Sequence, residues 1–176
     1  MDISKIAAGK QPPMDVNAII EIPVGGPPVK YEVDKASGAM FVDRFLHTAM
    51  SYPVNYGFIP HTLSEDGDPC DVMVVASLGV VPGSVIRCRP VGALLMEDEA
   101  GVDEKILAVP LRALDPSYED VRSYKDLPEI LLKKIGHFFE HYKDLEAGKW
   151  VRLLRWVDAE EAAEMIGQSM ERYERS

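Results

Sequence analysis

Three aspartates lie within six residues of one another and form the densest group of chemically active side chains in the chain. They are Asp66, Asp68 and Asp71, with Gly67 and Pro69 between them. Carboxylates packed this closely repel one another and resist joint ionisation unless a cation lies among them. Oxygen-only ligands favour Mg²⁺, Mn²⁺ or Ca²⁺ over zinc. The segment therefore predicts either a site for a hard cation or an exposed acidic turn.

A second acidic segment, 97–105, repeats this composition. It reads Glu-Asp-Glu-Ala-Gly-Val-Asp-Glu-Lys and contains Asp98 and Asp103. Either segment alone is typical of a solvated acidic turn. Because each lies beside an apolar stretch that reads as a strand, the two together favour a shared metal site.

Two other metal-site patterns are matched only in part. Asp66 and Asp68 occupy the first two ligand positions of an EF-hand, but Cys70 stands where that loop needs Asp or Asn, and the next residue is not glycine. His137 and His141 match the H-x-x-E-H pattern of inverted zinc peptidases. That short pattern arises by chance, and packing or subunit contact is the preferred interpretation. Neither a calcium sensor nor a zinc peptidase is predicted.

Basic and phenolic side chains lie on both sides of the acidic segments. In the alternating stretch 29–34, Lys30 and Glu32 point to the same face of a predicted strand. Arg44 and Tyr56 follow along the chain. On pattern alone, each of these is an ordinary strand, surface or core position.

Short apolar strands separated by Pro and Gly dominate residues 17 to about 111. The pattern predicts strands over 18–22, 29–34, 39–42, 71–78, 84–96 and 105–109. Many short strands with turns between them predict a small closed or partly closed β-barrel.

Helical periodicity replaces this pattern in the last third of the chain. One helical stripe comprises Leu131, Ile135, Phe138 and Tyr142. Tyr142 and Lys143 lie at its end, where they read as a core tyrosine and a lysine that complements the helix dipole.

The expected helix boundaries come from capping patterns. Asp126 and Glu129 resemble a capping box, and Gly148 marks the expected end of the helix. Residues 150–157 read as a further strand, and Asp158 with Glu161 opens a last helix. The apolar side of that helix carries Ala162, Ala163, Ile166 and Met170. We therefore expect an α+β chain, mainly a β core, with two or three helices packed outside it.

Length and charge narrow the class of protein. The 176 residues, 47% hydrophobic and 27% charged, fit a single domain over residues 1–176. Nineteen basic against 29 acidic residues give a net charge of −10. Nucleic-acid binding depends on Lys and Arg that neutralise phosphates, so no nucleic-acid partner is expected.

The apolar segments and the cysteines of the sequence indicate the cellular compartment and the redox state of the thiols. No apolar run approaches the roughly 20 residues that cross a bilayer, and no apolar signal core is present, so we expect a cytoplasmic protein without a membrane partner. Cys70 and Cys88 are too few for a disulfide framework and are expected as reduced thiols. Because Cys70 lies among the aspartates, its exposure decides whether its modification inactivates the site.

Taken together, these segments resemble family I soluble inorganic pyrophosphatase, in its short bacterial type, along nearly the whole chain. The family signature matches segment 66–72, Asp-Gly-Asp-Pro-Cys-Asp-Val, in which Cys70 takes a variable position. The companion motifs follow in the expected order: Glu-Ile-Pro at 21–23, Lys-Tyr-Glu at 30–32, Phe-Val-Asp-Arg at 41–44, Tyr-Pro-Val-Asn-Tyr-Gly at 52–57, Pro-Gly-Ser at 82–84, Asp-Glu-Ala-Gly-Val-Asp-Glu-Lys at 98–105, and Phe-Phe-Glu-His-Tyr-Lys at 138–143.

The resemblance implies a fold, a reaction, a cofactor and an assembly. The fold is an OB-like five-stranded β-barrel with helices outside it. The reaction is hydrolysis of inorganic pyrophosphate to two orthophosphates. The cofactor is Mg²⁺, several ions to each active site, with Mn²⁺ left open as a substitute. The assembly is a homohexamer.

The resemblance also assigns the acidic residues. Asp66, Asp71 and Asp103 match the ligands of the tightly bound metal, with Asp71 bridging to a second ion. Asp98, together with Asp103, matches the residue that holds a further metal, which Glu21 supports. Asp68 corresponds to the general base that takes a proton from the attacking water.

The remaining assignments concern the substrate. Tyr56 matches a hydroxyl near the nucleophile, and Lys105 is expected to face the substrate as well. The phosphate-binding positions are matched by Lys30, Arg44, Tyr142 and Lys143. Because magnesium ions held by aspartates reverse the local sign of charge, this scheme also explains how an acidic protein binds an anionic substrate.

Two alternatives stay open on the sequence. A metal-dependent hydrolase of another phosphoanhydride, such as a nucleotide, would need a Walker-type loop or aromatic residues near the acids, and neither is evident. An OB-type nucleic-acid-binding module would need a basic groove interleaved with aromatic residues, and the predicted strands offer little of either.

Overall fold

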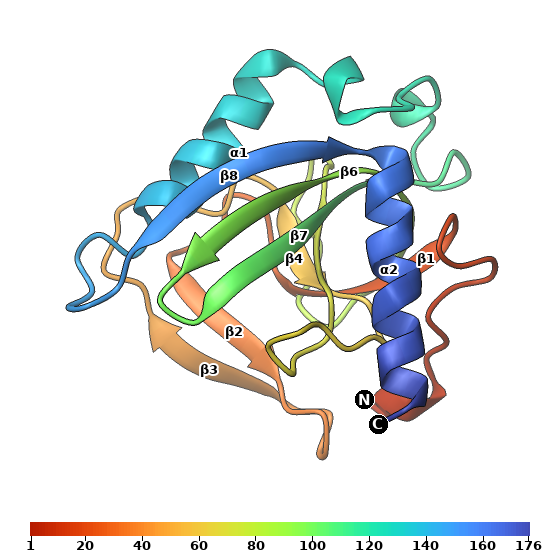
Figure 1. Ribbon diagram of the computed structural model, residues 1–176, viewed down its shortest axis with the longest axis horizontal. Coiled ribbons are helices and arrows are strands. Elements are labelled where there is room, and N and C mark those ends of the chain that lie inside the picture. The colour runs from red at the N-terminus through yellow and green to blue at the C-terminus, as the bar shows by residue number, and fades with distance from the viewer.

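A computed structural model describes residues 1–176, and its centre is a six-stranded sheet that curls on itself (Figure 1). The strand order is β1-β4-β5-β7-β6-β8, and β1 pairs with β6 as well as with β4. This second pairing gives a curled ring of five strands, as expected for an OB-like core. The strands of the sheet are β1 (Val16–Ile22), β4 (Asn55–Phe58), β5 (Asp71–Val74), β6 (Val85–Asp98), β7 (Gly101–Pro110) and β8 (Val151–Asp158).

The two faces of the sheet bury separate apolar clusters, because successive side chains of a strand point to opposite faces. On β5, Met73 packs into the cluster that contains α1 (Glu129–His141). Its neighbours Val72 and Val74 pack into the cluster that contains α2 (Ala159–Glu174). Each helix therefore packs on one of these two clusters.

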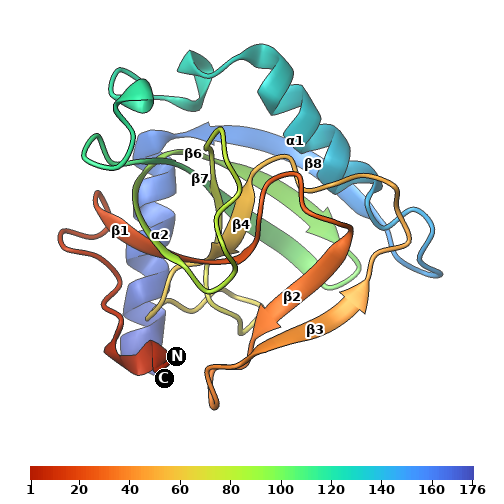
Figure 2. The ribbon, with the colours of Figure 1, turned by 180° about the vertical axis from the view of Figure 1, so that it is seen from behind.

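The two helices lie on different sides of the ring (Figures 1 and 2). Helix α1 buries Ile135 and Phe138 of the predicted stripe together with Phe139. Helix α2 buries Ala162 and Ile166, as the sequence predicts. No helix in the structure is both long and apolar enough to span a bilayer.

A separate hairpin stands beside the ring and consists of β2 (Val29–Val33) and β3 (Met40–Phe45). Figure 2 shows it projecting away from α2. Its turn is tight, since the N–H of Gly38 donates to the carbonyl of Asp34 at 2.7 Å, and Gly38 adopts a φ of +67° that favours glycine.

One strand of the ring was not predicted from the sequence. Strand β4 is buried at all four positions, so it shows no alternation of polar and apolar residues. Its Gly57 packs against β1 so closely that a Cβ atom would lie 1.9 Å from the carbonyl oxygen of Ile19. The pattern that identifies a half-buried strand is therefore absent here.

The acidic segment after residue 96 also differs from the expectation. Strands β6 and β7 extend through it as a hairpin, in which Asp98 pairs with Gly101 and Met96 with Asp103. The sequence pattern instead predicts that one strand ends at 96 and the next begins at 105. Strand β5, in contrast, ends at Val74 rather than at residue 78.

The predicted capping box of α1 is wrong. Asp126 instead completes a capping box with Ser123 on the short 3-10 turn Tyr124–Asp126, and Pro128 precedes the helix without a side-chain cap. The helix ends at His141, before the predicted Gly148. At α2, the Asp158 side chain accepts from the N–H of Ala159, which confirms the predicted N-cap, although Glu161 pairs with Arg155 instead of closing a box.

Candidate active site

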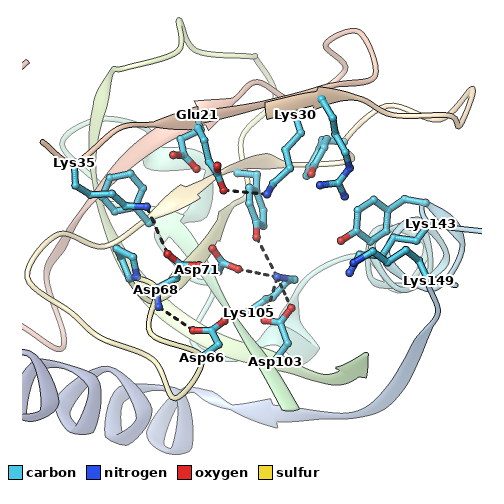
Figure 3. A pocket seen from close by; sticks show the side chains of 17 residues that line it. Glu21, Lys30, Lys35, Asp66, Asp68, Asp71, Asp103, Lys105, Lys143 and Lys149 are labelled. Atoms are coloured by element: carbon cyan, nitrogen blue, oxygen red, sulfur yellow. Dashed lines mark hydrogen bonds and ion pairs between the residues drawn. The ribbon is translucent and has the colours of Figure 1, made fainter. Parts of the chain in front are cut away.

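A cavity of about 200 Å³ lies between the ring, the hairpin β2–β3 and the segment that follows α1 (Figure 3). Eleven of the twelve residues predicted to act in the site line this cavity. The twelfth, Asp98, contacts the lining residue Lys143. The eleven are Glu21, Lys30, Arg44, Tyr56, Asp66, Asp68, Asp71, Asp103, Lys105, Tyr142 and Lys143.

The ammonium group of Lys105 lies at the centre of the acidic side of the cavity. It is 2.7 Å from Asp71 Oδ2 and 2.9 Å from Asp103 Oδ2, and it donates to the hydroxyl of Tyr56 at 3.0 Å. The Lys105 side chain is only 4% exposed. Burial alone would lower its pKa, but the carboxylates of Asp103 and Asp71 raise that pKa well above its ordinary value. Lys105 is therefore a buried, charged centre that holds two of the predicted metal ligands in place.

The parallel pairing of β5 with β7 explains why these residues meet. In this register Asp71 lies directly beside Lys105, although 34 residues separate them in the sequence. Asp103 stands two positions before Lys105 on β7, on the same face of the strand. The β-sheet therefore fixes the geometry of this group.

A second lysine joins the other acidic segment to the end of α1. Lys143 Nζ lies 2.7 Å from Asp98 Oδ2 and 3.8 Å from a carboxylate oxygen of Glu99. The Lys143 side chain is 10% exposed. Because α1 ends at His141, Tyr142 and Lys143 are delivered to the cavity directly from the last turn of the helix.

The hairpin contributes the remaining basic groups. Lys30 and Arg44 are paired across β2 and β3. Lys30 Nζ lies 3.0 Å from Glu32 and 3.5 Å from Asp43, and Arg44 contacts Asp43 at 2.9 Å and Glu146 at 3.3 Å. These contacts orient both cations, and they leave both groups at the wall of the cavity.

Glu21 lies on β1 at the upper edge of the cavity and is buried. Burial raises the pKa of its carboxyl group to about 7. The N–H of Val33 on the hairpin donates to it at 2.7 Å, which opposes part of that effect. Glu21 therefore links the ring to the hairpin and at the same time faces the cavity.

The signature segment 66–72 forms the edge of the cavity opposite Glu21. The carboxylate of Asp66 accepts from the N–H of Asp68 at 3.0 Å, which fixes the turn around Gly67. The side chain of Asp68 is 71% exposed, and its nearest cationic partner is Lys35, at 3.7 Å. Asp68 therefore stands at the mouth of the cavity with its carboxylate directed toward solvent.

The acidic residues suit a hard divalent cation in their donor chemistry. They offer carboxylate oxygens only, the ligand type that Mg²⁺ prefers over zinc. Asp71 and Asp103 already converge on one cationic group, that of Lys105. As the side chains stand, no three His, Cys, Asp or Glu residues lie close enough together to hold an ion. The donors thus fit such a cation while being spread around the cavity.

Several residues that line the cavity were not predicted. Glu32 could have been found, because strand alternation places it on the same face as Lys30. Lys149 and Lys35 carry no local signal, since only the folded chain brings the loop after α1 and the hairpin turn to the cavity. The unpredicted lining residues are Glu32, Lys35, Tyr52, Phe58, Pro69 and Lys149.

An aromatic cluster also lies beside the acidic groups, where the sequence showed none. The rings of Tyr52 and Phe138 are 4.5 Å apart, and Tyr56 and Phe139 join them. All four residues are buried, at 1–7% exposure. Phe138 and Phe139 belong to α1, and they pack against Tyr52 and Tyr56, which line the cavity. The cluster therefore joins α1 to the wall of the cavity.

Two predicted features lie outside this cavity. The rings of His137 and His141 are 4.7 Å apart, and His141 Nδ1 contacts Asp144 at 2.9 Å on the surface. Cys70 points away from the cavity, is 1% exposed, and lies in the apolar cluster under α2. Burial raises the pKa of the Cys70 thiol to about 12, so the thiol is both covered and protonated.

Comparisons with known proteins agree with this geometry. The family model for inorganic pyrophosphatase matches residues 18–174. An inorganic pyrophosphatase of Caulobacter vibrioides is 64% identical over 176 residues, which are 100% of this chain and 99% of that protein. One from Rhodospirillum rubrum is 65% identical over 166 residues, 94% and 93% of the two chains.

Solved structures give the same result. The crystal structure of inorganic pyrophosphatase from Thermus thermophilus superposes with a TM-score of 0.93 at 41% identity and covers 99% of both chains. The structure of an inorganic pyrophosphatase from Coxiella burnetii gives 0.92 at 49% identity, over 96% of this chain and 99% of that one. With its signature residues gathered at one cavity and its whole length matched, the chain belongs to the inorganic pyrophosphatase family.

Proposed function

We propose that this chain hydrolyses inorganic pyrophosphate to two orthophosphates. The observation that supports this best is the division of the cavity into an acidic side and a basic side, which Figure 3 displays around Lys105. Pyrophosphate is a compact, highly charged anion, and a protein of net charge −10 repels it unless local cations reverse the sign of the field. The names of the relatives support the same reaction.

Family membership implies a requirement for a divalent metal ion. We assign Mg²⁺ to this role and place it on Asp66, Asp71 and Asp103. Asp71 would bridge to a second ion, and Asp98 with Asp103 would hold a further one that Glu21 supports. When bound, the metal lowers the pKa of the attacking water and offsets the charge of the phosphates. The chain's own part is to present carboxylate oxygens from strands that are fixed by the sheet.

Asp68 is the proposed general base. Its carboxylate is exposed at the mouth of the cavity and accepts no hydrogen bond from the rest of the chain. Its lone pairs are therefore free to take a proton from water while the new O–P bond forms and the bond from phosphorus to the bridging oxygen breaks. General-base catalysis of this kind contributes roughly 10²–10⁴-fold to the rate.

The basic side holds the phosphates and stabilises the leaving group. Arg44 offers a forked guanidinium, which binds two phosphate oxygens at once, while Lys30 and Lys143 act as point charges. Tyr142 presents its hydroxyl group at the same wall of the cavity. Such groups, aimed at the oxygens on which charge develops, are the usual means of accelerating phosphoryl transfer.

Tyr56 and Lys105, two residues with proposed roles, lie in contact with each other in the cavity. Burial raises the pKa of Tyr56 well above its ordinary value, so its hydroxyl keeps its proton. That hydroxyl accepts from Lys105 and is left with its own proton to donate near the attacking water. Lys105 lines the cavity and is proposed to face the substrate there. Its positive charge is partly balanced by the carboxylates of Asp71 and Asp103, which it contacts.

We also propose that the chain is a single domain over residues 1–176, that it assembles as a homohexamer, and that it works in the cytoplasm. Exposed apolar side chains away from the cavity support self-association, among them Leu78 and Val81 at about three-quarters exposure. Light scattering after size exclusion tests the assembly. A mass near six times 19.5 kDa is expected, and a monomer would contradict it.

The reaction is tested by comparing pyrophosphate with ATP as substrates at equal concentration and excess Mg²⁺. Rapid orthophosphate release from pyrophosphate, with slow release from ATP, is expected because the cavity of about 200 Å³ is lined mostly by charged side chains, which suit a compact anion better than a nucleoside. Faster release from ATP would instead favour the alternative phosphoanhydride hydrolase.

A further inference from the structure

Lys35 stands apart from the other basic residues of the cavity. It belongs to the turn between β2 and β3, and Figure 3 shows it beside Asp68, across the cavity from Lys143 and Lys149. Its Nζ lies 3.7 Å from Asp68 Oδ1. The positive charge of Lys35 is therefore placed next to the proposed base, while Lys30, Arg44 and Lys143 are placed at the proposed phosphate-binding wall and Lys105 pairs with Asp71 and Asp103.

The contact is an ion pair rather than a hydrogen bond. At 3.7 Å it exceeds the usual donor–acceptor range of about 2.7–3.2 Å. The Asp68 carboxylate accepts no hydrogen bond and has no other ion pair in the chain. Lys35 thus attracts this carboxylate without occupying the lone pairs that must receive a proton.

Lys35 is itself held in place by its surroundings. Its ammonium lies 5.8 Å from the ring centroid of Phe58, which is 3% exposed on β4. Its turn is fixed by the N–H of Ser37, which donates to the Asp34 carboxylate at 2.7 Å. Half of the side chain is covered, since its exposed fraction is 46%. These contacts restrict the positions that the ammonium adopts.

The packing of the turn adds a further restraint. Gly38 lies so close to residue 1 that a Cβ atom there would be 1.6 Å from the carbonyl oxygen of Met1. Lys35 also lines a second cavity, together with Ile3 of the N-terminal turn and Tyr173 of α2. The hairpin turn is therefore held by the N-terminus, whose amino group donates to the carbonyl of Gly38 at 3.2 Å. The two ends of the chain lie close together in Figures 1 and 2.

We propose that Lys35 is a positioning residue that holds the carboxylate of Asp68 at the mouth of the cavity, in the orientation that receives the proton of the attacking water. The inference rests on the proposed role of Asp68. Without Lys35, an exposed aspartate side chain with no other partner samples several rotamers, and fewer of them direct an oxygen at the water. Exposed ion pairs are weak, so loss of Lys35 reduces turnover by about two- to fivefold.

Glu21 is the competing partner of Lys35, because the positive charge of Lys35 also acts on the Glu21 carboxyl group. If Lys35 served Glu21 instead, its removal would act independently of Asp68. A double-mutant cycle separates these two roles.

The experiment compares Lys35→Met, Asp68→Asn and the double variant in steady-state hydrolysis of pyrophosphate at saturating Mg²⁺. We expect Lys35→Met to lower kcat about two- to fivefold at unchanged KM, and Lys35→Arg to restore most of it. In the Asp68→Asn background, Lys35→Met should have no further effect on kcat. Lys133→Met, an exposed lysine on α1 paired only with Glu129, is the matched control and should behave as wild type.

Three results would overturn the proposal. A raised KM at unchanged kcat would show that Lys35 binds substrate. An equal loss of kcat in both backgrounds would show that it acts elsewhere, as it would through Glu21. Normal turnover of Asp68→Asn would show that Asp68 is not the general base. In that case the proposed role of Asp68 fails first, and the role of Lys35 fails with it. Melting temperatures of all variants, expected to lie within a few degrees of wild type, exclude misfolding as the cause.

Discussion

On one side of the cavity, Asp71 and Asp103 stand on β5 and β7, two neighbouring strands of the ring, and both contact the buried ammonium of Lys105. On the other side, Lys30 and Arg44 stand on a hairpin that pairs with no strand of the ring, and the Arg44 side chain is 35% exposed against 4% for Lys105. The groups proposed to hold the metal are thus built into the sheet, and the groups proposed to bind the anion stand on its periphery. Substitutions on the two sides should therefore have different effects. Those on the sheet side should weaken metal binding and stability, and those on the hairpin should weaken substrate binding.

The largest effect is expected from the sheet side, on replacing Asp71 with Ala. Loss of this carboxylate should reduce kcat/KM by about 10³-fold or more, because metal binding and charge stabilisation fall together. It should also lower the free energy of unfolding. The loss should be smaller than the roughly 3–5 kcal/mol expected when a buried ion pair is fully broken, because Lys105 still pairs with Asp103.

Calorimetric titration of Mg²⁺ and a denaturant melt check both effects of Asp71→Ala. The control is Asp120→Ala, at an exposed position outside the cavity. Near-normal turnover with unchanged Mg²⁺ affinity would show that Asp71 is not a metal ligand.

Replacing Asp68 with Asn should separate chemistry from stability. We expect kcat to fall by roughly 10²–10⁴-fold, because the amide cannot take a proton. Mg²⁺ affinity and melting temperature should stay close to those of wild type, since the Asp68 side chain is 71% exposed and has no hydrogen bond to lose. A parallel loss of Mg²⁺ affinity would instead make Asp68 a ligand.

Replacing Arg44 with Lys should affect the basic side alone. A lysine keeps the charge but loses the forked guanidinium, so we expect KM for pyrophosphate to rise about tenfold with a smaller change in kcat. The melting temperature should not change, and Arg112→Lys, at an exposed ion pair remote from the cavity, is the control. A large fall in kcat at constant KM would contradict the assignment of Arg44 to substrate binding.

A change at α2 should leave the reaction untouched and affect stability only. In Asp158→Ala the helix loses its N-cap and the ion pair with Lys125, and we expect a loss of about 1 kcal/mol at pH 7. The hydrogen bond with Lys125 and others lower the pKa of Asp158 from 3.8 to about 2 in the folded chain. A group with a lowered pKa stabilises the fold above its unfolded value and loses this effect as the pH falls.

The stability difference between wild type and Asp158→Ala should therefore persist above about pH 4 and shrink as the pH falls from 3.8 to about 2. Chemical denaturation at several pH values measures it. A difference that remains constant down to pH 2 would show that the ionised carboxylate is not what caps α2.

The smallest effect is expected from Cys70. Its thiol is 1% exposed, so iodoacetamide should not label it in the folded chain at pH 8, and activity should persist. In denaturant, both Cys70 and Cys88 should react. Rapid labelling of the folded chain with loss of activity would show that the cavity and the cluster beneath α2 open together.

The sequence predicts which residues meet at the cavity better than it predicts the elements that carry them. Asp66, Asp71 and Asp103 carry their signal in their type and spacing, and all of them reach one cavity. Lys35 carries no such signal, because only the turn of the hairpin brings it to Asp68. Strand β4 shows no alternating pattern because it is buried on both faces, and Asp126 caps a different turn because Ser123 competes for it as a capping partner.

The central claim is that this cavity hydrolyses pyrophosphate with a divalent metal. It is tested most directly by orthophosphate release from pyrophosphate, measured on the purified chain with excess Mg²⁺ and again with EDTA. We predict rapid release in Mg²⁺ that EDTA abolishes. Absence of release in Mg²⁺ from a chain shown to be folded by its cooperative melt, or release that EDTA leaves unchanged, would contradict the claim.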